Sequence, residues 1–155
     1  FASFKQQTSS SLKLLIAGRF AWQTSEIKEA YENSLVKEDI QFLGYVSDEE
    51  LPRLVASALA LTYVSLFEGF GVPLLEALQA QVPVLTSSVS SLPEVAGDAA
   101  LLVDPTDVSA IAAGMKRLYE SEDLRNALVE KGTQRVEEYS WEKAVEVIEA
   151  ALRLR

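Results

Sequence analysis

Five short apolar runs, each followed by a polar connection, dominate the hydrophobic pattern of the chain. They cover residues 12–17, 40–43, 59–63, 82–86 and 100–103. Short runs of nearly continuous apolar character are typical of strands that are buried on both faces of a parallel sheet. Because helical stretches lie between them, the pattern predicts an α/β fold: a Rossmann-like parallel sheet with helices on both faces.

Side chains that can accept hydrogen bonds from free backbone amides mark the predicted helix starts. Ser47 and Glu50 have the spacing of a capping box, and Val46 and Leu51 can pack across it as a hydrophobic staple. We therefore expect a helix from Leu51 onward. A further helix is expected over residues 24–35, with its apolar residues on one side.

Beyond residue 105 the alternation stops, and three amphipathic helices follow in succession. Their predicted N-caps are Thr106 or Asp107, Ser121 and Ser140. We expect these C-terminal helices, residues 106–155, to pack on the sheet. Trp141 is expected in the core, because aromatic residues at helical spacing usually face one.

Length and composition narrow the classes of protein that the chain can belong to. A chain of 155 residues is typical of a single domain with a sizeable core. It has no cysteine and no histidine, which excludes disulfides, zinc chemistry and serine–histidine hydrolysis within these residues. The net charge of −9 argues against nucleic acid as a partner. The longest apolar run is too short to cross a bilayer.

The most informative segment, residues 68–76, joins the third predicted strand to a helix. Gly69 and Gly71 allow backbone conformations that other residues avoid, and they let a ligand approach the backbone amides closely. Phe70 can form a wall of a pocket, and Pro73 fits the first turn of the helix. The free amides at such a helix start attract an anion.

Two carboxylates flank these amides. Glu76 lies about one helical turn in, and helical side chains lean toward the N-terminus, so its carboxylate can share the space above the amides. An acid beside a bound anion is useful when it binds hydroxyl groups, so the combination indicates a polyol phosphate. Each acid alone also has an ordinary explanation, Glu76 as a solvated acid favoured by the helix dipole and Glu68 as a loop residue.

The segment resembles the E-x7-E motif of the retaining glycosyltransferases of family 4, with Glu68 and Glu76 as its two acids. Further similarity to that family covers most of the chain in order. It lies in residues 44–47 (GYVS), 81–87 (QVPVLTS), 91–95 (SLPEV) and 97–105 (GDAALLVDP).

The resemblance implies the C-terminal, donor-binding half of a GT-B fold. Its reaction would move a sugar from a nucleotide-diphosphate sugar to an acceptor hydroxyl, with retention at the anomeric carbon. Glu68 would be the catalytic residue, holding hydroxyls of the donor sugar near the reacting carbon. The donor-binding residues would be Gly69, Phe70, Gly71, Val72, Glu76, Tyr45 and Val46. In this scheme the amides of residues 69–72 line the sugar and phosphate, Glu76 accepts from the ribose hydroxyls, and the backbone of residues 45–46 meets the base.

The same resemblance implies partners but no metal and no cofactor beyond the nucleotide-sugar substrate. In the family, a strand with a basic loop that contacts the diphosphate opens this half, and an acceptor domain precedes it. Neither precedes Phe1, so residues 1–155 are expected to form a single nucleotide-sugar-binding domain that is inactive without the acceptor domain. Arg19 is interpreted as a surface residue rather than a replacement for the basic loop. We expect a cytoplasmic protein of polysaccharide biosynthesis, and peripheral attachment of a longer protein to a membrane stays open.

Two other functional classes stay open at this point. A nucleotide-sugar epimerase of the same architecture would share the sheet and the donor cleft, and analysis of its products would distinguish it. A flavodoxin-like interaction module would need acids after the first strand to hold Mg²⁺, where Ala17, Gly18 and Arg19 stand instead.

Overall fold

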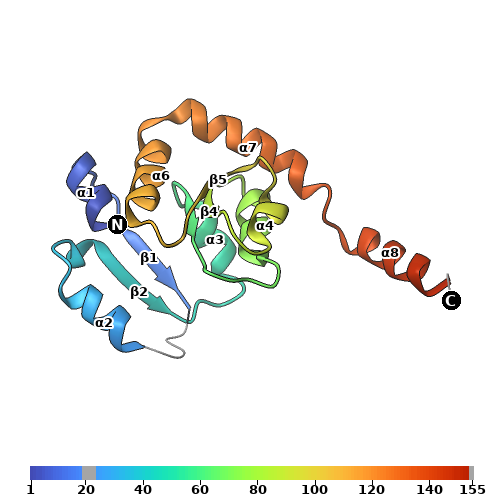
Figure 1. The fold of residues 1–155 in the computed structure, drawn as a ribbon, viewed down its shortest axis with the longest axis horizontal. Coiled ribbons are helices and arrows are strands. Elements are labelled where there is room, and N and C mark those ends of the chain that lie inside the picture. Colours follow the sequence, from blue (N-terminus) through green and yellow to red (C-terminus); the bar gives the residue numbers. More distant parts are fainter. Residues whose placement is uncertain (19–23, 154–155) are drawn as a thin grey trace. The chain divides into compact units, whose positions relative to one another are not determined.

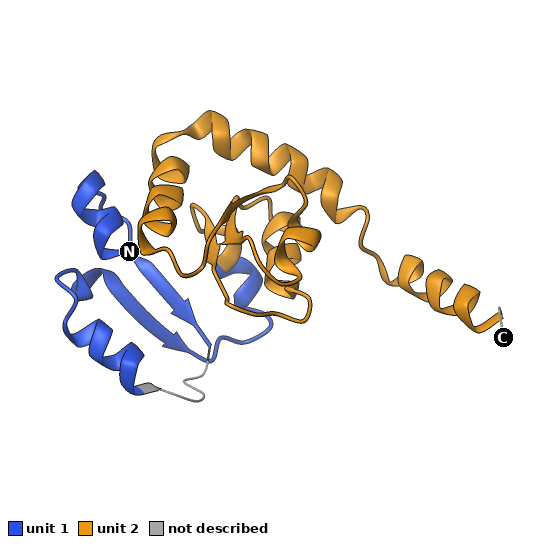
Figure 2. Ribbon diagram, in the orientation of Figure 1, with its two compact units in different colours: residues 1–54 blue, residues 55–155 orange. Residues whose placement is uncertain are grey.

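The computed structural model of the chain describes residues 1–18 and 24–153. These residues form two compact units, residues 1–54 and 55–155, which Figure 2 shows in different colours. The strands of the described residues form one two-stranded and one three-stranded parallel sheet. Arg19 lies outside the described residues. That residues 1–155 make a single nucleotide-sugar-binding domain stays a prediction.

Unit 1 is built around two parallel strands (Figure 1). Its elements are α1 (Ala2–Thr8), β1 (Leu14–Ala17), α2 (Thr24–Glu32), the 3-10 helix η1 (Lys37–Asp39), β2 (Ile40–Gly44) and the start of α3 (Leu51–Ala56). An ion pair of 2.7 Å between Lys5 Nζ and Asp39 Oδ2 ties α1 to the segment before β2. The helix predicted over residues 24–35 ends earlier, at Glu32, and Leu35 is exposed rather than part of a buried stripe.

The predicted capping box is confirmed in part, in the turn that leads into α3: the bond from the Glu50 amide to the Ser47 hydroxyl oxygen is present, while the Glu50 carboxylate binds the serine hydroxyl. The backbone N–H of Glu50 donates to Ser47 Oγ at 3.3 Å, and the Ser47 hydroxyl donates to Glu50 Oε2 at 2.8 Å. The glutamate therefore binds the serine hydroxyl and the serine binds the glutamate amide. This exchange fixes the point at which the chain leaves the loop after β2.

Unit 2 contains a three-stranded parallel sheet in the order β3-β4-β5. Its elements are β3 (Leu61–Tyr63), α4 (Val72–Gln79), β4 (Val84–Ser87), α5 (Leu92–Ala96), β5 (Ala100–Val103), α6 (Val108–Glu120), α7 (Glu122–Val136) and α8 (Trp141–Arg153). Three predicted strands begin two residues later than expected, at Leu14, Leu61 and Val84. Before β4 the reason is a turn, in which Gln81 has a φ of 58° and the Val82 N–H donates to Ala77 O.

The central strand β4 carries both layers of the core. Every residue of β4 is buried, and successive side chains of a strand point to opposite faces. On one face, Val84 packs with Leu74 of α4 and Leu92 of α5. On the other face, Leu85 packs with Leu118 of α6 and Leu128 of α7. Helices therefore cover both faces of this sheet, as the apolar runs predict.

The C-terminal helices begin where the sequence places their caps. Asp107 Oδ1 accepts from the amides of Ser109 and Ala110 at 2.8 and 2.9 Å. Ser121 Oγ accepts from Leu124 N–H at 3.1 Å, and Ser140 Oγ accepts from Lys143 N–H at 3.2 Å.

The expected core position of Trp141 is wrong. Its side chain is 86% exposed, and α8 contains no buried residue, whereas α6 and α7 bury Ala112, Leu118 and Leu128. An amphipathic pattern shows that a helix has an apolar face but does not say what covers that face, which explains the error. Within the described residues, no helix has both the length and the apolar character needed to cross a bilayer.

Candidate functional site

The loop between β3 and α4 is held in place by serines that follow β4. The Glu68 N–H donates to Ser90 Oγ at 3.0 Å, and the same hydroxyl donates back to Glu68 O at 2.6 Å. Ser91 Oγ donates to Glu68 O at 3.0 Å and to Phe70 O at 2.9 Å. Neighbouring parallel strands end at the same edge of a sheet, which brings these two loops together. The backbone around Glu68 is therefore fixed by side chains of another loop.

The carboxylate of Glu68 has a partner on the preceding strand that the sequence pattern does not predict. The Tyr63 hydroxyl donates to Glu68 Oε1 at 2.6 Å, and Glu68 is half-buried. Burial of the phenol raises the pKa of Tyr63, and the hydrogen bond and negative charge of Glu68 raise it further. The phenol thus keeps its proton as the donor at neutral pH. The available signal was a tyrosine at the carboxyl end of the strand before the motif.

Gly71 forms the N-cap of α4 and has a conformation that requires glycine. Its φ is 107°, and a Cβ built on it would lie 2.7 Å from Leu92 Cδ2. For Gly69 the expectation of a special conformation is wrong, because its φ lies outside the positive region and a Cβ there would meet nothing within 4 Å. Only the second glycine of the motif is demanded by the backbone.

The start of α4 leaves several amides for a ligand. Gly71 has no side chain to cap the helix, Pro73 has no N–H, and the Leu74 N–H donates to Gly71 O at 3.0 Å. Within the described residues, no hydrogen bond engages the amides of residues 69–72. Unpaired amides at a helix start are a favourable environment for a phosphate.

The remaining predicted donor-binding residues, Glu76, Tyr45 and Val46, differ in their exposure to solvent and in the unit to which they belong. Glu76 lies on the exposed side of α4, between half-buried Leu75 and buried Ala77, so its carboxylate faces solvent. Tyr45 is exposed and Val46 half-buried, and both belong to unit 1. Within the described residues, no group of three or more His, Cys, Asp or Glu side chains is placed to hold a metal ion.

Phe70 links the loop to the end of α7. Its ring meets the ring of Tyr139 edge-on, with centroids 5.8 Å apart and an interplanar angle of 78°. Tyr139 in turn accepts a hydrogen bond of 2.9 Å from Arg135 Nη2, and the guanidinium lies 5.1 Å from the centre of its ring. The candidate wall of the site therefore rests on a side chain that follows α7.

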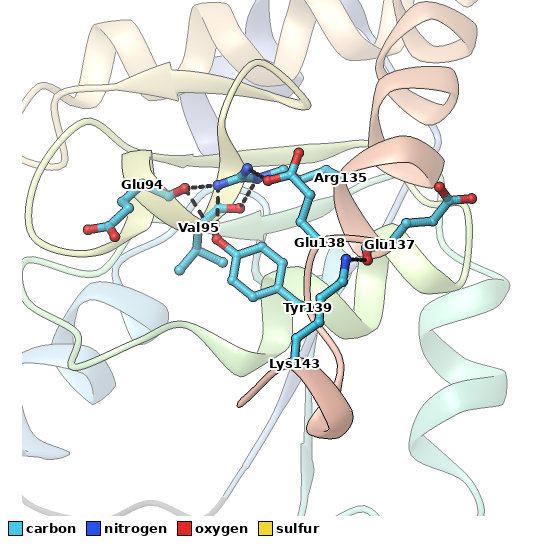
Figure 3. A network of polar contacts seen from close by, with 7 residues as sticks. All are labelled: Glu94, Val95, Arg135, Glu137, Glu138, Tyr139 and Lys143. Carbon is cyan, nitrogen blue, oxygen red and sulfur yellow. Dashed lines mark hydrogen bonds and ion pairs between the residues drawn. The ribbon is translucent and has the colours of Figure 1, made fainter. Parts of the chain in front are cut away.

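Arg135 is the centre of the polar network in Figure 3. Its Nε donates to Val95 O at 3.1 Å, and Nη2 also donates to Glu94 O. These carbonyls belong to the last turn of α5, which has no further helical amides to bind them. Nη1 pairs with Glu138. One guanidinium thus joins α7 to the end of α5 and supports Tyr139.

We expect Arg135→Ala to lower the free energy of unfolding by about 1.5–3 kcal/mol, the range for hydrogen bonds to a charged group. Chemical denaturation measures the change. Lys131→Ala is the matched control, since the Lys131–Asp98 pair of 2.9 Å is exposed at both ends and its loss should cost much less than the loss of the Arg135 contacts. Equal losses in the two variants would contradict the assignment.

Comparison with known proteins identifies the family. The sequence model of the family described as "Glycosyl transferases group 1" matches residues 1–135. The chain belongs to this family.

Relatives of this glycosyltransferase domain include mannosyltransferases. The chain is 39% identical over 136 residues to O-antigen chain mannosyltransferase B of Escherichia coli. The matched segment covers 88% of the chain and 36% of that protein. It is 41% identical over 101 residues to the MMP alpha-(1->4)-mannosyltransferase of Mycolicibacterium hassiacum, covering 63% of the chain and 25% of that protein. The chain thus spans about a third or less of the length of these relatives.

Solved structures share the fold of this glycosyltransferase domain. Anabaena Alr3699/HepE in complex with UDP superposes with a TM-score of 0.87 at 15% identity, over 99% of the chain and 44% of that structure. Sucrose-phosphate synthase from Thermosynechococcus elongatus gives a TM-score of 0.82 at 24% identity, over 99% of the chain and 41% of that structure.

The comparisons confirm part of what the sequence predicts. The α/β fold, which matches GT-B glycosyltransferase structures, and the assignment to the glycosyltransferases are confirmed. Membership of family 4, the retaining mechanism, and the individual roles of the site residues stay predictions.

Proposed function

We propose that this chain is the donor-binding part of a retaining glycosyltransferase that transfers a sugar from a nucleotide-diphosphate sugar to an acceptor hydroxyl. The observation that supports it best is the half-buried Glu68 carboxylate, held by Tyr63 in the loop that leads into the uncapped start of α4. Mannose is the first candidate for the sugar, because relatives with 39% and 41% identity are named mannosyltransferases.

Each part of the segment has a role in this proposal. Glu68 accepts hydrogen bonds from hydroxyls of the donor sugar, since an ionised carboxylate is purely an acceptor. The amides of Gly69, Phe70, Gly71 and Val72 bind sugar and phosphate oxygens. Glu76, exposed one turn into α4, accepts from the ribose hydroxyls. Tyr45 and Val46 contribute backbone groups to recognition of the base.

The chemistry of the transfer is mainly electrostatic. Departure of the nucleotide leaves negative charge on the diphosphate, and preorganised amides stabilise that charge without having to reorient. Holding donor and acceptor together supplies a further part of the rate enhancement. The scheme requires no metal ion and no cofactor.

A longer protein supplies the remaining parts in this proposal. An acceptor domain and basic groups for the diphosphate complete the site, which agrees with the chain spanning only 36% of O-antigen chain mannosyltransferase B. Turnover is therefore expected of the full-length protein and not of residues 1–155 alone. A cytoplasmic location and a role in polysaccharide biosynthesis belong to the same proposal.

Nucleotide binding tests the proposal directly. The full-length protein is heated with UDP, GDP or ADP, and with their mannose and glucose forms, and one nucleotide is expected to raise its melting temperature. A ligand at 100 times its Kd stabilises by about 2.7 kcal/mol. Glu76→Ala should weaken binding of that nucleotide by about 1.5–3 kcal/mol, or roughly 10–150-fold, the size of a lost charge-assisted hydrogen bond.

The matched control for this measurement is Glu130→Ala, which removes an exposed acid from α7. It should leave the calorimetric Kd unchanged. An unchanged Kd in Glu76→Ala would remove the ribose role from Glu76. Absence of stabilisation by every nucleotide and nucleotide sugar would contradict the proposed function as a whole.

A further inference from the structure

We propose that Tyr63 is a positioning residue for glycosyl transfer: its hydroxyl holds one oxygen of the Glu68 carboxylate so that the other oxygen faces the donor sugar. The inference rests on the proposed function of Glu68. It assigns a role to a residue outside the segment of residues 68–76, on the preceding strand.

Tyr63 is itself held firmly. It is the last residue of β3 and lies opposite Thr86 in the pairing with β4. Its carbonyl accepts a hydrogen bond of 2.7 Å from the hydroxyl of Thr86, which is fully buried. Its ring packs against the core cluster that contains Leu74 and Leu92. Strand pairing, a buried hydroxyl and the core therefore fix the direction in which the phenol points.

Glu68 is fixed independently of Tyr63. Both backbone groups of Glu68 bind Ser90 Oγ, at 3.0 and 2.6 Å, and Ser91 Oγ adds a bond of 3.0 Å to its carbonyl. The backbone that carries the carboxylate thus belongs to one anchored loop, while the phenol belongs to the sheet. Two groups anchored separately and joined by a hydrogen bond of 2.6 Å restrict the orientations that the carboxylate can take.

The chemistry of the pair suits a site for sugar hydroxyls. A carboxylate has two oxygens with about four acceptor positions, and the phenol occupies one of them on Oε1. Within the described residues, no hydrogen bond of Oε2 occurs, so that oxygen is left to accept from a substrate hydroxyl. The raised pKa of Tyr63 keeps the phenol protonated at neutral pH, and it therefore donates throughout. A carboxylate that is ordered before the substrate arrives loses less entropy on binding it.

Tyr63→Phe in the full-length protein tests the inference, because it removes only the hydroxyl. We expect kcat/KM for the nucleotide sugar to fall by about 10–100-fold, the loss typical of one hydrogen bond to a charged group. The Kd for the nucleotide alone, without its sugar, should change less than about twofold, since the nucleotide contacts are assigned to Glu76 and the amides. If the hydroxyl were merely structural, its removal would lower kcat/KM and weaken nucleotide binding to a similar extent. That result would overturn the inference. An unchanged kcat/KM would overturn it as well.

Two further variants separate this inference from the proposed function. Tyr31→Phe removes a hydroxyl from α2 and should leave kcat/KM and Kd unchanged. Glu68→Gln is made alone and together with Tyr63→Phe. The kcat/KM of the double variant should be little lower than that of Glu68→Gln itself, because the two groups act as one unit. If Glu68→Gln keeps its turnover, the proposed role of Glu68 fails. If Glu68→Gln loses turnover and the effect of Tyr63→Phe adds fully to it, only the positioning role fails.

Discussion

Glu68→Gln in the full-length protein is expected to lower kcat by about 10²–10³-fold, the range found when one preorganised polar contact to a transition state is removed. Glutamine has the same shape, and its amide oxygen can still accept from Tyr63. Its nitrogen, however, would then replace the second carboxylate oxygen and would donate where the sugar hydroxyl needs an acceptor. Steady-state kinetics measures this loss of kcat. The substrate is the nucleotide sugar that gives the thermal shift.

The contrast between binding and turnover makes this result specific. The Kd for the nucleotide alone should stay within about twofold of the unsubstituted protein, because Glu68 contacts the sugar in the proposed scheme. The melting temperature should also be retained, since the backbone of Glu68 is held by Ser90 and Ser91 and not by its carboxylate. Glu130→Gln, in the exposed face of α7, is the control for loss of one negative charge. Full turnover by Glu68→Gln would refute the catalytic assignment.

Gly71→Ala is expected to lower the free energy of unfolding by about 2–5 kcal/mol. A φ of 107° is unfavourable for any residue with a Cβ, at roughly 1–2 kcal/mol. The added Cβ would lie 2.7 Å from Leu92 Cδ2, and overpacking of a full core costs roughly 1–3 kcal/mol more. Leu92 is fully buried, so it has little room to move away. Denaturant titration of the chain measures the difference.

Gly69→Ala is the matched control, two positions away in the same loop. Its Cβ would meet nothing within 4 Å, and its φ is not in the positive region. A glycine in an ordinary conformation can even gain up to about 1 kcal/mol on replacement, because the unfolded chain becomes less flexible. Equal destabilisation by the two substitutions would show that the strain at Gly71 does not matter.

Features that depend on neighbours in sequence could be predicted, and the α/β alternation of unit 2 is the clearest. Strand runs and helix caps are short-range signals, so Asp107, Ser121 and the capping box of Ser47 and Glu50 were found from the sequence. Strand starts were less accurate, because the apolar run before β4 includes Val82, which belongs to a turn.

Features that depend on contacts between distant segments could not be predicted. The hydrogen bonds from Ser90 and Ser91 to the backbone of Glu68 join residues about twenty positions apart, and no local sequence pattern marks them. The two glycines of the motif look alike in the sequence, yet only Gly71 meets a core side chain. Likewise Gly114, within α6, weakens a helix on propensity alone, but a Cβ there would lie 2.5 Å from Leu85 Cδ1. Close packing of helix on sheet explains this glycine.

The hydrogen bonds from Ser90 and Ser91 to the loop also matter for protein engineering. Because Ser90 and Ser91 bind the main chain of residues 68 and 70, the shape of this loop is encoded in two pieces of sequence. A chimera that exchanges residues 64–72 between members of the family should include residues 87–91 of the same parent. The side chains of Leu66 and Phe67 are exposed, so we expect a library randomised at these two positions to keep that shape.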